Sequence, residues 1–508
     1  MSMTPPLLPL ALAALALPCQ PQVSPVEESA VILLLSLDDA LRIALENDLE
    51  LATQVLDTEI AALNARGAWG AFDPVLSVTG TLRDSEIQGQ SSLAGADVVQ
   101  ENSQRLNGSL LLPFKTGGAF LLEYGRVNDS TNNVFATFDV YTRDVVTLSL
   151  NQPLLQGGWR RYATLDQEDN ELTYRVADQS EAVLRQLLLL DVANAYWDLV
   201  RAQAELEVRQ RARALGDRAL AQEERRLEVG AGTEVDVLQA KTNLAQRDEE
   251  ILRARFDRAA AEDALRQRLF QRGDEDREAY LERWESRIEP TTELPEPAER
   301  EAPGDWRVAL ARAFEERPAL VAARLEIERA ELAIDRSRSG RLPRVDLDLS
   351  ASSAGFDREP EGAFEIATSY DFPTYQGSLT FEMPIFNRIG RYGLRSARVA
   401  ARKARLAYEQ AELAILAEVR AAVRDVVYGA QKLAAAEASR ALAERQLAAE
   451  ESRRENGLST TFQVLEFQQT LAEALSTEKM AAVDYAKALA GLAHAKGEID
   501  DWAAARAR

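Results

Sequence analysis

The sequence predicts a mixed α and β membrane protein, in which an antiparallel sheet continues into long α-helices and the whole plan occurs twice. Three observations predict it. A segment around Gly230 reappears around Gly457, long stretches dominated by Ala, Leu, Glu, Arg and Gln flank both copies, and short runs of alternating polar and apolar residues lie between these stretches. Such a composition is typical of long helices, and alternation with a period of two is typical of strands with one apolar face.

The duplicated segment is typical of the tip of a helical hairpin. Residues 226–239 reappear, with substitutions, as residues 453–466, and both copies keep a glycine, a threonine three residues later and then Val-Leu. A glycine readily adopts the left-handed conformation that ends a helix, and a threonine can cap the next helix through its hydroxyl. We therefore expect two long hairpins, with tips near Gly230 and Gly457.

The first 19 residues are typical of a signal peptide. Leu7 to Pro18 form an apolar run of suitable length that ends at Cys19, although no Lys or Arg precedes the run. Two interpretations of Cys19 stay open: a residue removed with the signal peptide, or a site of lipidation. It is the only cysteine, so a disulfide within the chain is impossible. No other stretch reaches the roughly 20 apolar residues of a membrane-spanning helix, so strands would have to cross a membrane.

The composition argues against several classes of function. The 59 Lys and Arg residues against 82 Asp and Glu residues give a net charge of −23, with no basic stripe that could replace the counterions of nucleic acid. His494 is the only histidine, and no nucleophile elbow, phosphate-binding glycine loop or cluster with metal-ligand spacing occurs. We therefore expect no enzyme activity, no metal site and no cofactor. Acidic pairs such as Glu223-Glu224 are interpreted as solvated helix faces.

The first repeat is expected at residues 36–270 and opens with a helix and strands. Ser36 begins a capping box, so a helix should start there and run to about Ala68. Alternation then predicts strands between residues 73 and 151, in four runs: 73–86, 104–112, 119–125 and 144–151.

A long helical hairpin completes the first repeat. The helical pattern resumes after Gly157-Gly158 and leads to the tip near Gly230, which corresponds to roughly 105 Å at about 1.5 Å per residue. Apolar residues recur along it at three- and four-residue steps, as in a coiled-coil seam. The return helix should begin at Thr233 and end near Phe270.

The plan then restarts after a connecting segment. Residues 271–305 are charged and rich in Glu and Pro, and we expect them to be a linker. The second repeat is expected at residues 306–500, with a helix to about Gly340, strands within residues 343–385 and a long hairpin with its tip near Gly457. The order of helix, strands and long hairpin would thus occur twice.

The segment from Val345 to Ser350 has one fully apolar and one fully hydrophilic face. This suits either a soluble sheet with a core or a barrel wall between lipid and lumen. The chain offers about six candidate strands, too few for a closed barrel together with a core, so closure should come from several chains. Trp69 and Trp159 fall where strands meet helices, and both an interfacial aromatic position and ordinary junction packing fit them.

The chain resembles the TolC-like outer-membrane efflux family. The doubled R-x-x-x-G-x-x-T-x-x-x-V-L motif and the P-L-L-Q-G-G strand exit at Pro153 carry the resemblance, which extends from about Ser36 to Lys496. It implies a homotrimeric transmembrane antiparallel β-barrel, continued by a long α-helical coiled-coil barrel, in the cell outer membrane with a large periplasmic portion. The implied function is an exit duct for efflux or secretion. Its implied partners are outer-membrane lipid, a periplasmic adaptor protein and an inner-membrane transporter.

The resemblance also implies roles for residues at the tips. The positions at which the family's tips meet the adaptor are occupied by Arg226, Val229, Gly230, Thr233, Asn456, Gly457 and Thr460. In the family, two carboxylates just after the second tip surround a narrow aperture. Here Gln463 fills the first of those positions and Glu466 fills the second, while Asp236 is the equivalent in the first hairpin. Glu466 equally suits a solvated helix face, and both interpretations stay open.

Two further alternatives stay open. The family's usual protomer gives four strands, whereas this chain offers four runs in the first repeat and two in the second. Either the barrel is enlarged or the pair of runs around Gly117-Gly118 lies elsewhere. The alternative function is a soluble coiled-coil scaffold or tethering protein of the periplasm, which accounts for the helices but not for the strands or the signal-like start.

Overall fold

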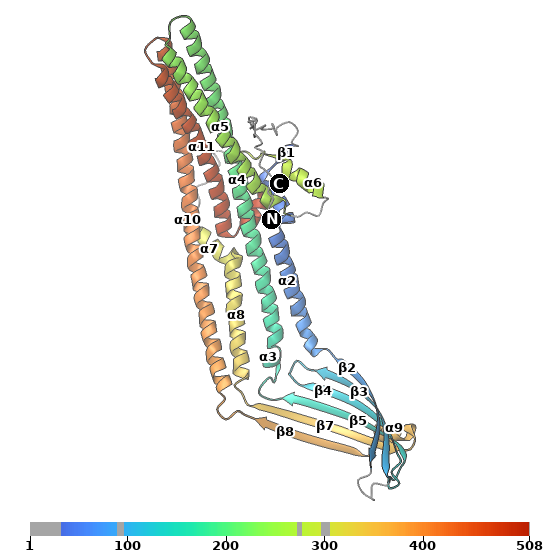
Figure 1. Cartoon of the computed structure of the whole chain (residues 1–508). Coiled ribbons are helices and arrows are strands. Elements are labelled where there is room, and N and C mark those ends of the chain that lie inside the picture. Colours follow the sequence, from blue (N-terminus) through green and yellow to red (C-terminus); the bar gives the residue numbers. More distant parts are fainter. Residues whose placement is uncertain (1–31, 89–95, 272–276, 296–304, 507–508) are drawn as a thin grey trace, which may run out of the picture.

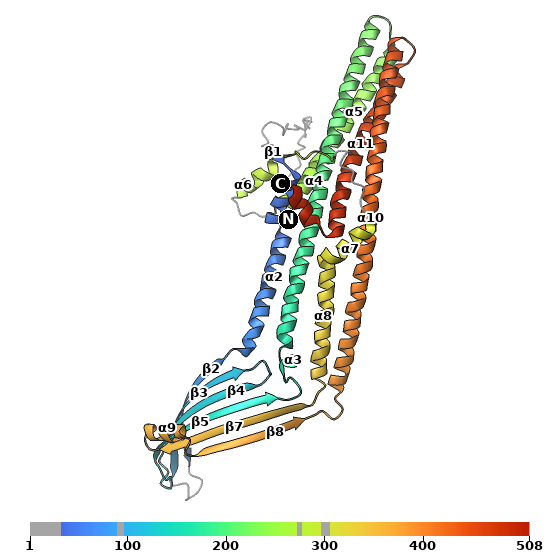
Figure 2. The ribbon, with the colours of Figure 1, turned by 180° about the vertical axis from the view of Figure 1, so that it is seen from behind.

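The structure, a computed structural model, describes residues 32–88, 96–271, 277–295 and 305–506. A long column of helices makes up most of the molecule, a curved sheet lies at one end of the column, and a small lateral domain lies beside its middle (Figures 1 and 2). The segment predicted to be a signal peptide, with Cys19, lies outside the described residues.

Two long helical hairpins form most of the column. They are α4 (Leu165–Glu228) with α5 (Glu234–Leu269), and α10 (Arg388–Glu455) with α11 (Thr461–Lys496). Helices α4 and α11 pack against each other, so the hairpins lie side by side. Between the lateral domain and the sheet, α2 (Leu49–Ala68) and α8 (Pro318–Ser339) widen the column. Within the described ranges, no helix has both the length and the apolar character needed to cross a membrane.

Six strands form one antiparallel sheet in the order β2-β3-β4-β5-β7-β8. Their bounds are β2 (Val75–Gln88), β3 (Val98–Pro113), β4 (Ala119–Thr131), β5 (Val140–Pro153), β7 (Arg344–Asp357) and β8 (Pro373–Glu382). Strand β5 pairs with β7, with Asn151 opposite Asp348, so strands from before and after the first hairpin share the sheet. The pair joined at Gly117-Gly118, β3 and β4, lies within this sheet and not elsewhere.

The pairing register gives the sheet two chemically different faces. One row across the strands consists of Leu76, Leu110, Leu122, Leu148, Ala351 and Tyr375. The adjacent row consists of Ser77, Ser109, Glu123, Thr147, Ser352 and Thr374. Successive side chains of a strand point to opposite faces, so we call these the apolar face and the polar face. Leu76 and Tyr375, on the two edge strands, are 73% and 75% exposed, so the apolar face is uncovered there.

Short helices lie at the junctions of the fold: η1 (Trp69–Phe72), α3 (Arg160–Ala163), α7 (Trp306–Glu316) and α9 (Pro360–Ser369). The two junction tryptophans contact the end of the sheet that adjoins the column: Trp69 contacts the turn from β3 to β4, and Trp159 contacts the chain that leaves β5. The amine of Lys115 lies 4.6 Å from the centre of the Trp69 ring, and the indole nitrogen of Trp159 donates a hydrogen bond to the Leu154 carbonyl (3.0 Å). Helix α9 lies between β7 and β8, within the residues 343–385 for which strands were expected.

The lateral domain contains a two-stranded parallel sheet, β1 (Ile32–Leu35) with β6 (Arg287–Pro290). Around it lie α1 (Leu37–Asn47), α6 (Arg277–Glu285) and α12 (Ile499–Arg506). The segment 271–305, expected to be only a linker, therefore contains a helix and a strand. The sequence did not predict them because the segment is charged and β6 is short. Only one isoleucine of β6, Ile288, is buried, in the largest apolar core of the described residues.

A partly buried polar cluster joins the second hairpin to the start of α8. Arg317, which precedes α8, donates hydrogen bonds to both carboxylate oxygens of Glu418 on α10 (3.0 and 2.8 Å). The same guanidinium donates to the carbonyl of His494 on α11 (2.7 Å), and His494 Nδ1 lies 3.1 Å from Glu418 Oε1. Burial acts against ionisation of Glu418, but the bond from His494 and the charge of Arg317 outweigh it, so the pKa of Glu418 lies below its ordinary value of 4.5.

This cluster predicts a pH dependence of stability. A carboxylate whose pKa is lowered by folding stabilises the fold above its unfolded pKa and loses that contribution as the pH falls through its folded pKa. We expect Glu418→Gln to destabilise the protein by about 1 kcal/mol at neutral pH, a modest value because the carboxylate is partly exposed. The difference from the parent protein should disappear in acid. Thermal unfolding in detergent at neutral pH and well below pH 4.5 tests this, and the exposed Glu409→Gln on the same helix is the control. An equal difference at both pH values would contradict the prediction.

Candidate functional site at the hairpin tips

Both hairpins turn through a glycine with a left-handed backbone. Gly230 has φ +75° and Gly457 has φ +77°, and open space surrounds the position where a Cβ would lie at each. Conformation, and not crowding, is therefore what favours glycine here. The turns close by equivalent bonds, from the Ala231 amide to the Arg226 carbonyl and from the Leu458 amide to the Arg453 carbonyl (2.8 and 2.9 Å).

The helices that follow the two tips are capped differently. Thr233 and Asp236 form a full capping box at the start of α5. At the start of α11 the Thr460 hydroxyl accepts a bond from the Gln463 amide (3.4 Å), but a neutral side chain replaces the aspartate. The hydrogen bonds from the Thr233 hydroxyl and backbone, together with the Arg226 charge, lower the pKa of Asp236 although partial burial opposes them. The Asp236 carboxylate is thus hydrogen-bonded within the capping box of its own helix.

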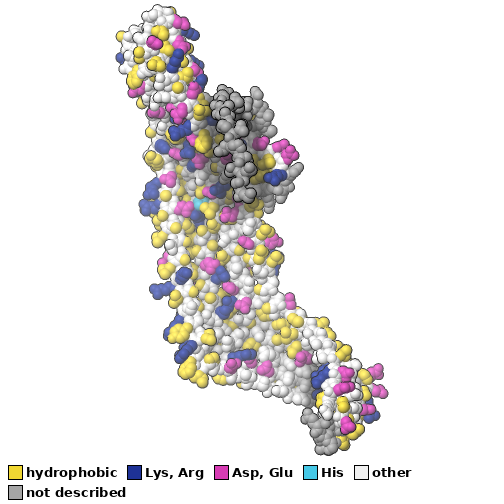
Figure 3. All heavy atoms as spheres, in the orientation of Figure 1, with side chains coloured by type: hydrophobic (Ala, Val, Ile, Leu, Met, Phe, Trp, Pro, Cys, Tyr) yellow, Lys and Arg dark blue, Asp and Glu magenta, His cyan; other side chains and the backbone are white. Residues whose placement is uncertain are grey.

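Apolar side chains project from both tips. Val229 is 77% exposed and Leu458 is 72% exposed, and each adjoins the glycine of its turn. Val235 and Phe462, in the first turns of α5 and α11, are also exposed. Hydrophobic side chains are visible among charged ones at this end of the column (Figure 3). Exposed apolar side chains clustered at one end of a molecule indicate a surface that contacts another protein.

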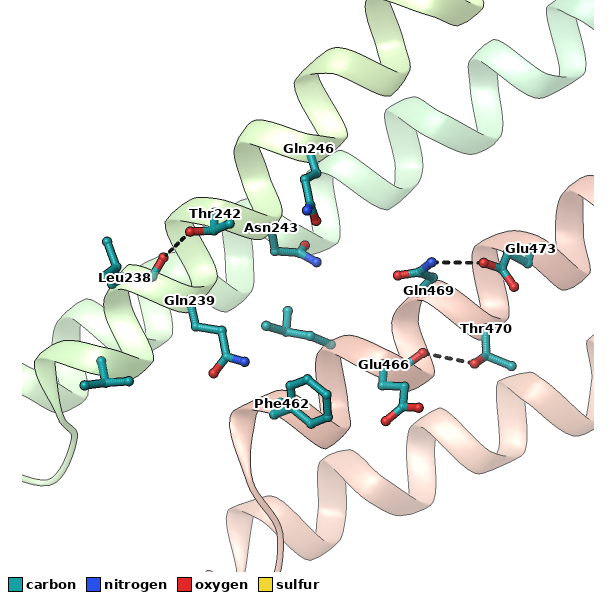
Figure 4. Close-up of a pocket in the computed structure, with 12 residues that line it drawn as sticks. Leu238, Gln239, Thr242, Asn243, Gln246, Phe462, Glu466, Gln469, Thr470 and Glu473 are labelled. Atoms are coloured by element: carbon teal, nitrogen blue, oxygen red, sulfur yellow. Dashed lines mark hydrogen bonds between the residues drawn. The ribbon is translucent and has the colours of Figure 1, made fainter.

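A groove of about 670 Å³ separates the two hairpins just behind the tips (Figure 4). Its α5 side carries Val235, Leu238, Gln239, Thr242, Asn243 and Gln246, and its α11 side carries Phe462, Leu465, Glu466, Gln469, Thr470 and Glu473. We call it the tip groove. Gln469 donates a hydrogen bond to Glu473 (3.0 Å). Glu466 lies exposed in the groove, and its side chain forms no ion pair with the part of the chain that the structure describes.

A buried ion pair links the two hairpins below their tips. Glu223 on α4 contacts the guanidinium of Arg454 on α10, and Thr461 on α11 donates a hydrogen bond to Glu223 Oε1 (3.1 Å). The side chains of Glu223 and Arg454 are 1% and 6% exposed, and burial lowers the pKa of Arg454. The interpretation of Glu223 as part of a solvated face is wrong. Its neighbour Glu224 is exposed, and only the packing of the hairpins distinguishes the two.

The structure brings the predicted tip residues of both hairpins to one end of the column. Arg226 donates a hydrogen bond to the Ala231 carbonyl (3.3 Å), so it also supports its own turn. Of the three aperture candidates, Gln463 and Glu466 lie exposed on α11, whereas Asp236 caps α5. In the described ranges no group of three or more acidic, histidine or cysteine side chains could hold a metal ion.

The sequence matches the family described as Outer membrane efflux protein over residues 41–269 and 309–498. No curated protein matches the chain. Among solved structures, the outer-membrane channel OprN has a TM-score of 0.65 at 16% identity, covering 91% of this chain and 90% of that chain. The CmeC outer membrane channel of Campylobacter jejuni has a TM-score of 0.63 at 14% identity, covering 91% and 86%. VceC of Vibrio cholerae has a TM-score of 0.63 at 18% identity, covering 91% and 96%. At these identities the structural likeness establishes the fold.

Proposed function

The chain belongs to the outer membrane efflux protein family, and from this membership we propose that three copies of it form one continuous exit duct. The protein is an outer-membrane efflux channel with a large helical periplasmic portion, and it is not an enzyme. The soluble scaffold is therefore set aside.

We propose that the trimer closes a transmembrane β-barrel through the edges of the sheet. The supporting observation is a six-stranded sheet with one apolar face, in which β2 and β8 each pair with only one neighbour. An edge strand of this kind offers unpaired backbone groups, and closure into a barrel satisfies them. Three copies would form a barrel of about 18 strands, a size that leaves an aqueous lumen. The polar face would line that lumen, and the apolar face would contact lipid.

We propose an internal two-fold repeat as the origin of the two hairpins. Each half of the chain has a helix, strands and a long hairpin in the same order. The two tips share their glycine conformation and turn bonds, which supports a common origin. The halves differ in what they give to the six-stranded sheet, because four of its strands precede the first hairpin and two precede the second.

We propose that the tips bind a periplasmic adaptor protein, which couples the duct to an inner-membrane transporter. The exposed apolar residues beside the two tip glycines support this docking surface. The adaptor would contact the tips at Arg226, Val229, Gly230, Thr233, Asn456, Gly457 and Thr460. Gly230 and Gly457 would shape the turns, and the side chains beside them would provide the contact area.

The double variant Val229→Asp and Leu458→Asp tests the docking surface. Both side chains are largely exposed, so the fold should tolerate the change, whereas two carboxylates in an apolar interface should weaken adaptor binding by at least about tenfold. We expect export from cells to fall while the assembled trimer persists in the outer membrane. Val134→Asp, exposed in the loop between β4 and β5, is the matched control. Unchanged export in the double variant would refute the docking surface.

We propose that Glu466 contributes the charge at the narrowest part of the duct, with Gln463 one helical turn before it. Its exposure in the tip groove, without an ion pair in the described residues, supports this assignment. Asp236 is a weaker candidate because its carboxylate accepts bonds from Thr233. Three copies of Glu466 would bring three carboxylates near one axis, where they would attract cations.

Single-channel recordings of the purified protein in planar bilayers test both the duct and its aperture. We expect a pore that divalent cations block from the periplasmic side. Glu466→Gln should weaken the block by about tenfold, which corresponds to about 1.4 kcal/mol of cation binding. Gln463→Asp should strengthen it by adding a second carboxylate. No pore in the parent protein would contradict the duct, and a block unaltered in both variants would contradict the aperture assignment alone.

A further inference from the structure

The short helix α9 lies on the apolar face of the sheet at its far end (Figures 1 and 2). Ala363 and Ala367 are fully buried against β7, where a Cβ on Gly355 would overlap the Ala363 carbonyl oxygen. Gly355 follows Ala351 and Ser353 at steps of two residues, so it belongs to the apolar face. The helix therefore covers the face that the proposed barrel turns towards lipid.

The level of α9 along the strand matches the outer edge of the bilayer core. Gly355, under the helix, lies ten positions after Val345, which is near the column. At about 3.3 Å per residue and a tilt of about 40°, this stretch spans about 25 Å across the membrane, which is the height of the apolar band of a membrane barrel. Between the helix and the column, the apolar face carries leucines such as Leu148 and Leu349. Helix α9 begins where that band would end.

Beneath α9 the apolar face changes to charged residues. Arg126 on β4 donates two hydrogen bonds to Asp144 on β5 (2.9 and 2.7 Å), and the Asp144 side chain is fully buried. The same guanidinium donates to the Pro360 carbonyl at the start of α9 (3.1 Å). Charges on the lipid side of a barrel are costly unless they are paired and covered. The helix covers this pair and accepts one of its hydrogen bonds.

The helix has three distinct sides. Ala363 and Ala367 contact the sheet, Glu361 and Glu365 are exposed, and Phe364 lies between these two sides. Phe364 packs edge-on against Tyr124, with ring centres 5.9 Å apart, yet 47% of it remains exposed. Tyr124 lies opposite Val146, on the column side of Arg126, so Phe364 faces the apolar band. An aromatic residue directed towards lipid beside a charged face directed towards water suits an interfacial helix.

We propose that α9 is an interfacial helix on the outer wall of the barrel, with lipid of the outer leaflet as its partner. Phe364 contacts the boundary between acyl chains and headgroups, and the side with Glu361 and Glu365 faces headgroups and water. The apolar contact is continuous with the lipid-facing band of the sheet, so one lipid surface covers both. The inference rests on the proposed barrel, because it takes the apolar face as the outer one.

Spin labels on single cysteines test the inference in liposomes. Cys19 is the only cysteine of the chain, so the labelled parent protein supplies the background signal. Phe364→Cys is compared with Glu365→Cys, its exposed neighbour on the same helix. A second pair on β8, Leu379→Cys on the apolar face and Ser378→Cys on the polar face, calibrates the method. Power saturation measures how often each label collides with oxygen, which partitions into lipid, and with a nickel complex, which stays in water.

We expect the ratio of oxygen to nickel accessibility to be about threefold higher at position 364 than at 365, because apolar oxygen partitions into lipid. Position 379 should exceed position 378 in the same sense. If 379 exceeds 378 while 364 resembles 365, α9 faces water or the lumen, and the inference is wrong although the barrel stands. If 378 and 379 do not differ, the barrel proposal itself fails, and with it the inference.

Discussion

Replacing Glu223 with alanine is expected to separate the two hairpins near their tips. Glu223 is the carboxylate that contacts Arg454, and both side chains are almost fully buried between α4, α10 and α11. Arginine stays protonated in proteins, so the variant would leave a buried charge without its partner. Removing one member of a buried ion pair costs about 3–5 kcal/mol. We expect this cost to be relieved by movement of the second hairpin away from the first.

Two measurements check this expectation. In planar bilayers Glu223→Ala should raise the conductance of the pore, and limited proteolysis should cut the ends of α4 and α10 faster than in the parent protein. Glu224→Ala is the matched control, because Glu224 is exposed, pairs with Lys241 at 3.5 Å and should contribute less than about 1 kcal/mol.

A double variant separates loss of the charge pair from general damage. Glu223→Leu with Arg454→Met removes both charges and keeps the apolar volume, a replacement that is often neutral for a buried pair. We expect it to restore the parent's protease resistance. If Glu223→Ala behaves like Glu224→Ala, the pair does not hold the hairpins together.

Replacing Gly117 with valine is expected to prevent assembly of the sheet. Gly117 has φ +83° in the turn from β3 to β4, and a Cβ there would overlap the Gly157 carbonyl oxygen. The left-handed conformation alone costs a β-branched residue about 1–3 kcal/mol, and the overlap adds to that cost. The backbone of 157 belongs to the passage from β5 to the column, so a shift there would move α4 relative to the sheet.

The amount of the proposed trimer in outer-membrane fractions is the quantity to measure. We expect it to fall at least tenfold in Gly117→Val. Gly108→Val is the matched control, because Gly108 lies in the middle of β3 with open space around its Cβ position. Equal trimer levels in the two variants would mean that the Gly117 turn tolerates a side chain and does not determine how the sheet meets the column.

The mixed helical and sheet fold, the efflux family and the outer-membrane location could all be predicted from the sequence, and all are confirmed. Their signals are local: long alanine-rich stretches, period-two alternation and the doubled glycine–threonine segment each act within a few residues. Three of the four strands of the first repeat, β3, β4 and β5, are longer than the runs that predict them. Strand β3 starts at Val98, although the alternating run begins at residue 104, because its polar start is held by pairing with β2.

Some residues of the candidate site could be predicted from local sequence signals, and others could not. Gly230 and Gly457 were predictable, because a left-handed turn between helices favours glycine in any chain. Glu223 was not, because a glutamate among charged residues on a long helix is usually solvated, and its partner Arg454 lies more than two hundred residues away. Asp236 was identified as an aperture candidate, whereas the structure shows its carboxylate in the capping box of α5.

Local patterns in the chain were enough to predict the elements and their order: two long hairpins, the turns within them, strands with one apolar side, and the family. The tertiary structure decided what those elements meet. It placed β3 and β4 in one six-stranded sheet, buried Glu223 between the hairpins, revealed β1 and β6 in the lateral domain and laid α9 across the apolar face. The difference arises from how far apart in the chain the interacting residues lie. Backbone conformation and periodicity depend on neighbours in the chain, whereas burial and charge pairing depend on segments that only folding brings together.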